Sequence, residues 1–498
     1  MYLMFDTLRN SLRLIRIAII LARHDVLFFW KKENIHGKGR KLTHALHEMG
    51  PTFIKLGQAL STRSDLVGQE IAQELAQLQD RLPPFSGGTA RAIIAKQFSK
   101  PIAELFASFD NRAAAAASIA QVHFATLHDG SEVAVKILRP GIEDAFARDI
   151  ALFYWLADLA QYWRPDWRRF KLREVVRTFE EMVRFELDLR FEASAAVELK
   201  KNLQLDTGFY IPQIHWELTS QRVLTSERIR GIPISDVAAI KAAGHEPAKL
   251  VDIAAVSFFR QVFRDGFFHA DLHPGNLFVL PSGWLAVVDF GIMGRLDKKS
   301  RIYLAQILHG FLTEDYHNLA KVHFEAGLVP AHKSVDNFAL ALMAITKPII
   351  GRKLSDISVA RLLGQLFTTA EAFEMEVQPH LLLLQKNMMI TEGVGRMLNP
   401  DVNMWQVAEP LIADWAKENL GARAQIKEKA EETIELIRSL PTLIRNAEVA
   451  LARVSDGGIK LHPDTVAAKK TSQREWLWFA WIAFFALYFL IFSKLTIY

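Results

Sequence analysis

Short runs of mostly apolar residues, bounded by turn-forming residues, predict two groups of β-strands. The first group comprises residues 105–109, 119–127 and 132–138, and the segment His128-Asp129-Gly130 joins the last two runs as a tight hairpin. The second group comprises residues 277–280 and 284–288, which Pro281-Ser282-Gly283 connects. The chain beyond the second group is predicted to be helical to about residue 467. The pattern indicates a mixed chain with a helical C-terminal part.

The C-terminus carries the longest apolar run. Residues 476–492 read WLWFAWIAFFALYFLIF and contain no charge, which approaches the length of a bilayer-spanning helix. Tryptophans lie at the start of the run, and Lys469, Lys470 and Arg474 precede it. This pattern predicts a membrane anchor over residues 476–495, with the bulk of the chain on the cytoplasmic side. The alternative is a buried or an interfacial helix.

The N-terminus is predicted to form a basic amphipathic helix within residues 1–40. Arg9, Arg13, Arg16 and Arg23 follow one helical stripe, with apolar residues beside them. The arginines interrupt the apolar run, so a secretory signal peptide is not expected. The helix either lies on anionic lipid or packs on the core of the protein.

Composition narrows the classes of function. The 498 residues suffice for one large two-lobed domain or for two domains with appendages. The 60 Lys and Arg residues against 55 Asp and Glu residues leave a net charge of +5, without a lysine-rich tract, so nucleic acid is not the expected partner. No cysteine is present, which excludes disulfides, thiolate metal sites and cysteine nucleophiles.

The second group of strands lies among residues that predict a magnesium and ATP site. Asp271 and Asn276 precede the hairpin, and Asp289 follows it within Asp-Phe-Gly. Protein kinases place an aspartate, an asparagine and a second aspartate in this order, because two metal ions and a phosphate chain need converging oxygen ligands. Each aspartate alone is more simply a turn or cap residue. Their joint spacing around a hairpin favours the metal site.

The first group of strands carries candidates for phosphate binding. Lys136 ends the sequence Val-Ala-Val-Lys in the third run, where a kinase lysine binds the α- and β-phosphates, although a lone strand lysine is more often a surface residue. An alanine-rich segment stands where kinases have a glycine-rich phosphate loop. We expect this segment to form the phosphate loop, and the alternative is a turn of helix. The segment consists of Ala113, Ala114, Ala115, Ala116, Ala117, Ser118, Ile119, Ala120 and Gln121.

Three acidic residues in the sequence RFELDLRFEA are candidate partners of Lys136. Glu186, Asp188 and Glu192 fall in one predicted helical run. Glu186 and Arg190 have the spacing of a surface ion pair, so the cluster also fits a solvated helix face. The spacing alone leaves both interpretations open.

These motifs together resemble the UbiB family, the atypical protein-kinase-like family of ubiquinone biosynthesis. They are FIKLGQALSTRSDL at residues 53–66, the alanine-rich segment, VAVK, ELDLRFEA, HADLHPGN and DFG, within residues 50–295. The resemblance implies an α+β, two-lobed protein-kinase-like fold with an N-terminal helical extension and a C-terminal transmembrane helix. The extension would cover residues 41–104, the N-lobe 105–230 and the C-lobe 231–467.

The resemblance also implies a lid over the active site. Lys55, Gly57 and Gln58 match its Lys-x-Gly-Gln motif, and three residues of spacing put Lys55 and Gln58 on one helical face. In the family this lid meets a Glu-x-Asp motif, here Glu186 and Asp188. Glu192 would then pair with Lys136. Glu227 falls where the nucleotide-binding hinge between the lobes would run.

The implied activity is that of a membrane-anchored, ATP- and Mg²⁺-dependent ATPase that supports ubiquinone biosynthesis. Lys136 would bind phosphates, and Asn276 and Asp289 would bind Mg²⁺. Asp271 would orient or deprotonate the nucleophile, for which water is one candidate. The alternatives are phosphoryl transfer to a protein or lipid hydroxyl, and a nucleotide-sensing scaffold. No Ala-Pro-Glu follows Gly291, which argues against a docked protein substrate.

Expected partners are anionic membrane lipid, polyprenylated quinone precursors, other ubiquinone-biosynthesis enzymes and, as an open alternative, a second copy of the chain. The expected location is the bacterial inner membrane, with the kinase-like domain on the cytoplasmic side.

Overall fold

The structure is a computed structural model, and the residues that it describes fall into several segments. They are residues 2–26, 38–61, 71, 74–75, 78, 82–163, 171–347, 369–370, 372–375, 379–399, 410–411 and 415. The chain divides into two compact units, one of residues 1–19 and 418–498 and one of residues 20–417. The predicted N-terminal helix is present as α1 (Tyr2–Arg23). All sites below lie in the unit of residues 20–417.

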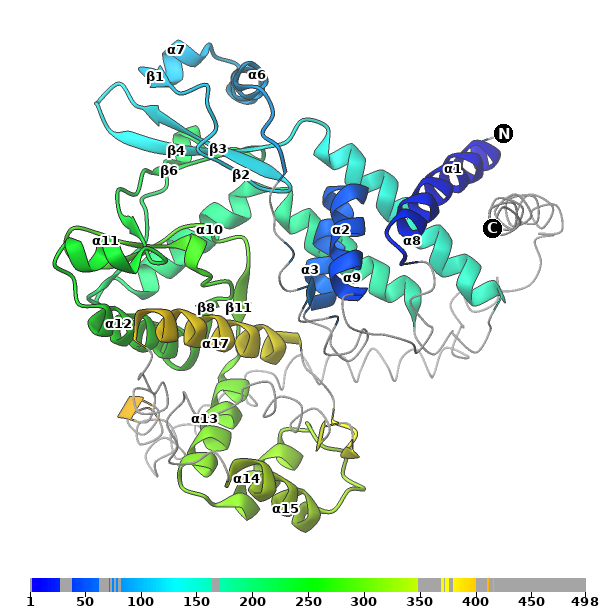
Figure 1. The fold of residues 1–498 in the computed structure, drawn as a ribbon, viewed down its shortest axis with the longest axis vertical. Helices are drawn as coiled ribbons and strands as arrows, with labels where there is room; N and C mark the ends of the chain where they lie inside the picture. The colour runs from blue at the N-terminus through cyan, green and yellow to red at the C-terminus, as the bar shows by residue number, and fades with distance from the viewer. Residues whose placement is uncertain are drawn as a thin grey trace, which may run out of the picture. The chain divides into compact units, whose positions relative to one another are not determined.

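An antiparallel sheet forms the first lobe (Figure 1). Its strands follow the order β1 (Ser108–Phe109), β3 (Ala120–Thr126), β4 (Glu132–Leu138) and β6 (Val223–Glu227), while β2 (Ala115–Ala116) pairs with β3. β3 and β4 pair along their whole length, from Ala120 opposite Leu138 to Thr126 opposite Glu132, which confirms the predicted hairpin. Val133, Val135 and Ile137 are fully buried on one face of β4, so the side chain of Lys136 belongs to the other face.

The strand predicted over residues 105–109 is wrong in most of its length. Residues Ile102–Leu105 form the short helix α7, and only Ser108–Phe109 form a strand. Leu105, Phe106 and Phe109 are all buried in the small core beneath α6 (Gly87–Phe98). These residues must be apolar because they are buried, whether they form a strand or the end of a helix. A short apolar run in the sequence therefore does not distinguish the two structures.

Three helices follow the sheet hairpin, namely α8 (Ile142–Trp163), α9 (Leu172–Glu186) and α10 (Leu189–Asn202). The single helical run predicted through Glu186 and Glu192 is wrong, because α9 ends at Glu186 and α10 begins at Leu189. Asp188 stands between them as the N-cap of α10 and accepts a hydrogen bond from the Arg190 backbone N–H at 3.1 Å.

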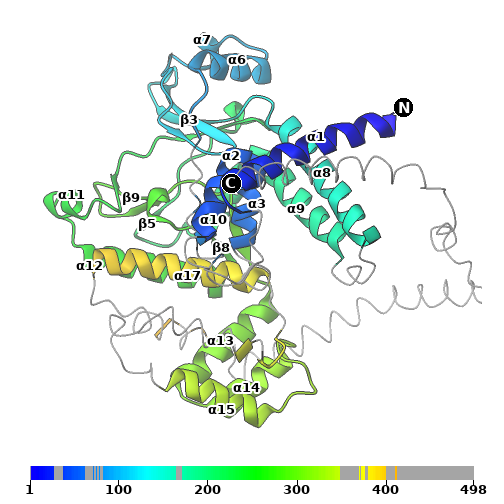
Figure 2. The same cartoon turned by 45° about the vertical axis from the view of Figure 1, so that its right-hand side comes forward.

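The helical extension comprises α2 (Lys38–Met49) and α3 (Pro51–Ser61). Figures 1 and 2 both show these helices beside α8 and α9. The rings of Phe53 on α3 and Phe153 on α8 meet edge to face at 5.4 Å between centroids. A Cβ atom at Gly57 would come within 2.8 Å of the Leu46 side chain, so this glycine permits α3 to approach α2 closely.

The second lobe surrounds two small sheets. One has the order β5 (Phe209–Tyr210), β10 (Leu285–Val287), β9 (Leu277–Val279) and β7 (Ile232–Pro233), and the other pairs β11 (Met293–Arg295) with β8 (Phe267–His269). β9 and β10 form the predicted second hairpin, whose turn uses Gly283 at φ +79°. Antiparallel pairing of β9 with β10 brings the residues before and after the hairpin to one end of it.

Helices account for the rest of the described second lobe, as predicted up to residue 399. They are α11 (Val237–Ala242), α12 (Pro247–Phe259), α13 (Lys298–Leu312), α14 (Tyr316–Glu325), α15 (Val335–Thr346) and α17 (Pro379–Leu398), together with the 3₁₀-turn η4 (Pro274–Asn276). The 3₁₀-turn η2 (Trp216–Leu218) belongs to the first lobe, where Leu218 is buried in the small core beneath α6. Figures 1 and 2 both show α17 lying along α12. Phe258 of α12 is fully buried in the same core that holds Leu384 of α17.

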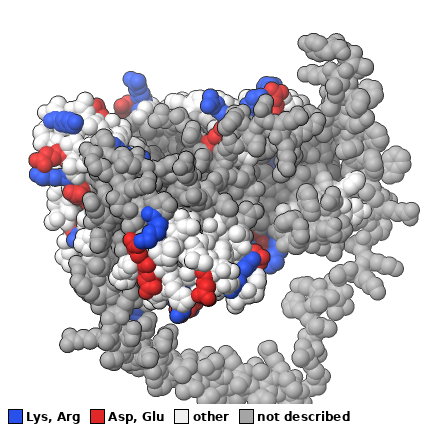
Figure 3. Space-filling model, turned by 60° about the horizontal axis from the view of Figure 1, so that its bottom comes forward, with Lys and Arg blue, Asp and Glu red and all other residues white. Residues whose placement is uncertain are grey.

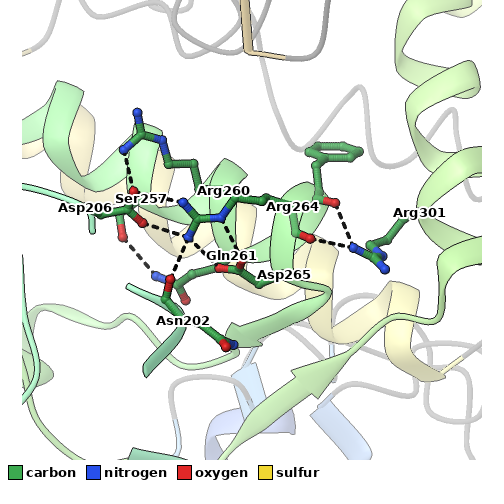
Figure 4. Close-up of polar contacts among 9 residues, drawn as sticks. Asn202, Asp206, Ser257, Arg260, Gln261, Arg264, Asp265 and Arg301 are labelled. Atoms are coloured by element: carbon green, nitrogen blue, oxygen red, sulfur yellow. Dashed lines mark hydrogen bonds and ion pairs between the residues drawn. The ribbon is translucent and has the colours of Figure 1, made fainter. Parts of the chain in front are cut away.

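A π-helical turn, η3 (Arg260–Asp265), continues α12 and leads through Gly266 into β8. Figure 4 shows its polar contacts: Arg260 and Arg264 both donate to the buried carboxylate of Asp206, each at 2.9 Å from Oδ1. Arg301 of α13 donates to the carbonyl of Arg264 at 2.7 Å. These charge-assisted bonds fasten the turn, which positions the side chain of Gln261 toward the site described below.

The described surface carries charges of both signs. On the face drawn in Figure 3, acidic and basic side chains of the described residues are interspersed. No described helix is both long enough and apolar enough to cross a membrane. The predicted anchor at 476–495 lies outside the described residues, as does the predicted helical region from residue 416 to 467.

Replacing Gly294 with alanine tests the packing of the β8–β11 pair. A Cβ atom there would lie 2.1 Å from the ring of the fully buried Phe268, so we expect the free energy of unfolding to fall by about 1–3 kcal/mol. Gly393→Ala is the matched control, because nothing lies within 4 Å of a Cβ at this helical position, and we expect unchanged or higher stability. Equal melting temperatures of the two variants would contradict the packing described here.

Candidate nucleotide site

A lysine ammonium paired with two carboxylates lies where the two lobes meet. Lys136 Nζ on β4 lies 2.8 Å and 2.9 Å from the two carboxylate oxygens of Glu192 on α10, and 3.2 Å from Asp289 Oδ1 after β10. The side chains of Lys136 and Glu192 are 16% and 8% exposed, whereas that of Asp289 is 46% exposed. One carboxylate therefore anchors the lysine from the inside, and the other faces the open side of the site.

The charges of this cluster shift the pKa values of its members. Burial alone would lower the pKa of Lys136, but the carboxylates of Asp289 and Glu192 outweigh it and raise that pKa above its ordinary value. Burial alone would raise the pKa of Asp289, but Lys136 and the Gly291 N–H hold it well below its ordinary value. The lysine is thus cationic and Asp289 anionic at neutral pH, which suits phosphate and metal binding.

The backbone around Asp289 is held in an unusual conformation. Asp289 has φ +68°, which is uncommon for a residue with a side chain, and its Oδ1 accepts the Gly291 N–H at 3.2 Å. Its carbonyl is 2.6 Å from His269 Nε2, and the next N–H, of Phe290, donates to Glu192. Contacts on both sides over-determine this strained residue, as is common where a side chain must point into a site.

His269 is buried and connects Asp289 with residues 270–276, the segment that corresponds to the catalytic loop of protein kinases and is called the catalytic loop below. Its Nδ1 accepts the Asp271 backbone N–H at 3.2 Å, so the proton lies on Nε2, which donates to the Asp289 carbonyl. Burial lowers the pKa of His269, which keeps the ring neutral. Gln261 of the π-helical turn accepts the His269 N–H at 3.0 Å and donates to Ser257 at 3.0 Å. The loop is therefore fixed from the direction of α12.

Asn276 links the catalytic loop to the hairpin. Its amide nitrogen donates to the Asp271 carbonyl at 3.1 Å, and its own carbonyl accepts the Val288 N–H at 2.9 Å. Asp271, Asn276 and Asp289 are thus brought to one end of the β9–β10 hairpin, as the sequence predicted. Their roles as catalytic residue and magnesium ligands stay predictions. Among the described residues, no three His, Asp or Glu side chains form a metal cluster by themselves.

Helix α17 contributes to the catalytic loop, which the sequence patterns did not predict. Lys386 Nζ lies 3.1 Å from Asp271 Oδ1. The fully buried Asn387 donates to the His269 carbonyl at 2.7 Å and accepts the Leu272 N–H at 3.0 Å. More than a hundred residues separate these partners, so no local spacing could reveal the contact.

The alanine-rich segment forms a tight strand turn, so the alternative of a helix turn is wrong. Ala115 and Ala116 pair with Val122 and Gln121, and Ala117 N–H donates to the Ala120 carbonyl at 2.8 Å. The side chain of Gln121 turns inward to Phe85 and His123 instead of the site. The described backbone from Ala113 to Ala120, which includes the buried Ser118 and Ile119, stays the predicted phosphate-facing loop.

The predicted lid residues lie on α3, and one of them forms a buried ion pair. Lys55 Nζ is 2.7 Å from Glu186 Oε2, with side-chain exposures of 9% and 14%. The predicted surface pair between Glu186 and Arg190 is wrong: Arg190 instead pairs with Asp188 at 2.7 Å. Asp188 therefore caps α10 and forms an ion pair with Arg190. The other two residues of the predicted lid motif lie on α3, where Gly57 faces α2 and Gln58 is half-buried.

Glu227 ends β6, where the chain passes from one lobe to the other. Its carboxylate accepts the Tyr210 hydroxyl at 2.7 Å and the Gln213 N–H at 3.0 Å. Burial and this carboxylate raise the pKa of Tyr210 to about 12. The contacts give Glu227 a structural role at the junction, and its predicted part in nucleotide binding stays a prediction.

The antiparallel first lobe, the lysine–glutamate pair and the Asp-Phe-Gly aspartate define a protein-kinase-like protein. Residues 77–323 match the ABC1 atypical kinase-like domain, and residues 342–403 match the UbiB helical domain. The chain belongs to the ABC1/UbiB family of atypical kinase-like proteins, which confirms the resemblance seen in the sequence.

Similar proteins support this assignment. A protein of Marinobacter nauticus named "Probable protein kinase UbiB" is 42% identical over 84% of this chain and 78% of its own. One of the same name from Aeromonas salmonicida is 41% identical over 85% of this chain and 79% of its own. The solved structure of Rv3197 with erythromycin, from Mycobacterium tuberculosis, covers 71% of this chain and 90% of its own at 24% identity and a TM-score of 0.50, a likeness of fold.

A double-mutant cycle tests the buried pair between α3 and α9. Lys55→Met leaves the Glu186 carboxylate buried without this partner, so we expect the free energy of unfolding to fall by about 3 kcal/mol. The double variant Lys55→Met with Glu186→Gln should recover roughly 1–3 kcal/mol of that loss. The exposed pair Arg184–Glu180 on the same helix is the control and should contribute less than about 1 kcal/mol. Additive effects at Lys55 and Glu186 would show that the pair is not coupled.

Proposed function

We propose that the protein binds Mg²⁺-ATP and transfers its γ-phosphoryl group to water, and that this turnover supports ubiquinone biosynthesis at a membrane. The observation that carries the proposal is the contact of Lys136 with both Glu192 and Asp289. In kinases such a lysine–glutamate pair positions the ammonium on the α- and β-phosphates, and the neighbouring aspartate holds the metal. The names of the relatives agree with a kinase-like activity and a role in the Ubi pathway.

The residues around the cluster fit a magnesium ion with a nucleotide. Magnesium in such sites takes one or two protein oxygens, and substrate phosphates and water complete its shell. The half-exposed carboxylate of Asp289 and the side-chain amide oxygen of Asn276 offer such a donor set, and a magnesium ion held in this way does not require a cluster of three acidic residues. The bound metal would supply charge that offsets the phosphates.

Each remaining residue has a task that follows from its place. Lys136 would hold the phosphate chain, and the tight turn at Ala117 would limit how closely the phosphates approach the sheet. Asp271 would orient the attacking oxygen and accept its proton. His269, fixed between Asp271 and Asp289, would keep the base and the metal ligand at a constant separation.

Water is the acceptor that the surroundings of the site favour. Helix α3 is anchored by the buried Lys55–Glu186 pair, so its lid would have to break that pair to admit a large substrate. The chain also passes from the Asp-Phe-Gly segment through β11 directly into α13, which leaves no long segment for docking a protein. Transfer to a protein or lipid hydroxyl is the second candidate, and it requires movement of α3.

A membrane setting completes the proposal. The charge-free run at 476–492 would anchor the chain in the bacterial inner membrane, with the kinase-like domain in the cytoplasm. Anionic lipid and polyprenylated quinone precursors would be its ligands there, and other ubiquinone-biosynthesis enzymes its partners. These ligands are proposed from the family and from the two terminal sequences.

Following γ-labelled ATP tests this function. The purified full chain in anionic liposomes with a polyprenyl-phenol should release labelled phosphate, because the site holds the base and the cationic residue for transfer. Asp271→Asn and Asp289→Asn should lower release by at least about 100-fold. Label on lipid or protein would instead establish the second candidate. ATP binding without release or transfer in the wild type would contradict the ATPase and favour a nucleotide-sensing scaffold.

A further inference from the structure

The catalytic loop contains no lysine or arginine of its own. Residues 270–276 read ADLHPGN, and His273 Nε2 is 3.8 Å from Asp271 Oδ2. Lys136 is already engaged by Glu192 and Asp289. Yet three phosphoryl oxygens share negative charge during transfer, and cations aimed at them are the main source of rate acceleration in this chemistry. A cation at the acceptor end of the site, beside Lys136 and the bound metal, would therefore speed transfer further.

Lys386 of α17 is placed to be that cation. Its ammonium lies 3.1 Å from Asp271 Oδ1, and the two side chains are 28% and 23% exposed, so they face the site without being sealed from it. A lysine next to the catalytic carboxylate lies within reach of any group that this carboxylate orients. The residue comes from the segment that matches the UbiB helical domain, outside the 77–323 match to the kinase-like domain.

The neighbouring residue holds this part of α17 rigidly on the loop. Asn387 is fully buried, and its amide bonds the backbone on both sides of Asp271, at His269 and at Leu272. Thr391, one turn later, donates to the Asn387 carbonyl at 2.8 Å. The backbone of Lys386 therefore has a set position relative to Asp271, which a lysine on a loosely packed surface helix does not have.

We propose that Lys386 is a catalytic residue that the helical domain supplies to the kinase-like domain. The inference rests on the proposed function. In the step itself, the acceptor oxygen forms a bond to the γ-phosphorus while the bond to the β–γ bridging oxygen breaks. The acceptor proton passes to Asp271, and ADP leaves with the bridging oxygen. Lys386 acts as a hydrogen-bond donor throughout: it holds the Asp271 carboxylate before transfer and contacts the γ-phosphoryl oxygens as they pass to the acceptor.

The helical domain would then be needed for turnover but not for nucleotide binding. The kinase-like domain alone would bind nucleotide through Lys136 but would lack the cation at the acceptor end. Any shift of α17 would remove Lys386 from Asp271 and slow transfer without releasing the nucleotide. Binding and turnover should therefore separate in variants of α17.

Substitution of Lys386 in the full chain, assayed in the same anionic liposomes, tests the proposal. For Lys386→Met and the more nearly isosteric Lys386→Gln, we expect kcat to fall by about 100-fold, while the Kd for ADP with Mg²⁺ changes by less than about threefold. Lys386→Arg should retain more activity than either, because it keeps the charge. Lys249→Met is the matched control, since Lys249 is an exposed helix lysine paired with Glu246, and its kcat should stay at the wild-type value.

The outcomes separate the two proposals. Wild-type turnover with kcat unchanged in Lys386→Met and Lys386→Gln would overturn the role of Lys386 and leave the ATPase intact. Lower melting temperature together with lost ADP binding in both variants would also overturn it, since that result describes a structural lysine. Wild-type protein that binds ATP without turnover, or that binds no ATP, would overturn the proposed function and, with it, the catalytic role of Lys386.

Discussion

One lysine ammonium shared by two carboxylates is the interaction on which the arrangement of the site depends. Lys136 comes from the sheet of the first lobe, Glu192 from α10 and Asp289 from the end of β10, so the cluster joins three elements that are distant in sequence. Two negative charges face one positive charge, and the less buried carboxylate points outward. A divalent cation at the outward carboxylate would offset this surplus negative charge, and the lysine would then be placed to meet a phosphate chain, a use that a well-packed apolar pair of the same volume could not serve.

The second lobe is organised around the position of this outward carboxylate. Gln261, His269 and the Asp289 carbonyl form a chain of hydrogen bonds from the π-helical turn to the Asp-Phe-Gly segment. Asn387 clamps the same loop from α17. The loop is therefore held from two helices, one of the kinase-like domain and one of the helical domain, so the second domain is part of the site's framework.

Sequence patterns predicted the parts of the fold that local rules govern. The β3–β4 and β9–β10 hairpins follow from apolar runs with turn residues between them, and the motif residues Lys136, Asp271, Asn276 and Asp289 fall at the lobe junction. Patterns failed where long-range contacts decide. The break between α9 and α10 at Asp188 depends on the capping of α10 and on the pairing of Glu186 with Lys55. The sequence predicts Leu105 in a strand, but the end of a helix buries it equally well. Lys386 could not be found, because its partner lies 115 residues away in sequence.

The most direct measurement is an experimental structure of the full chain with Mg²⁺ and a non-hydrolysable ATP analogue. The phosphate chain should lie between Lys136 and Asp271, with the Lys136 ammonium within hydrogen-bond distance of the α- or β-phosphate. The metal should contact Asp289, and its other ligands should include Asn276 and phosphate oxygens. A nucleotide bound elsewhere, or one whose phosphates do not contact Lys136 while the Lys136–Glu192 pair stays closed, would contradict the central claim.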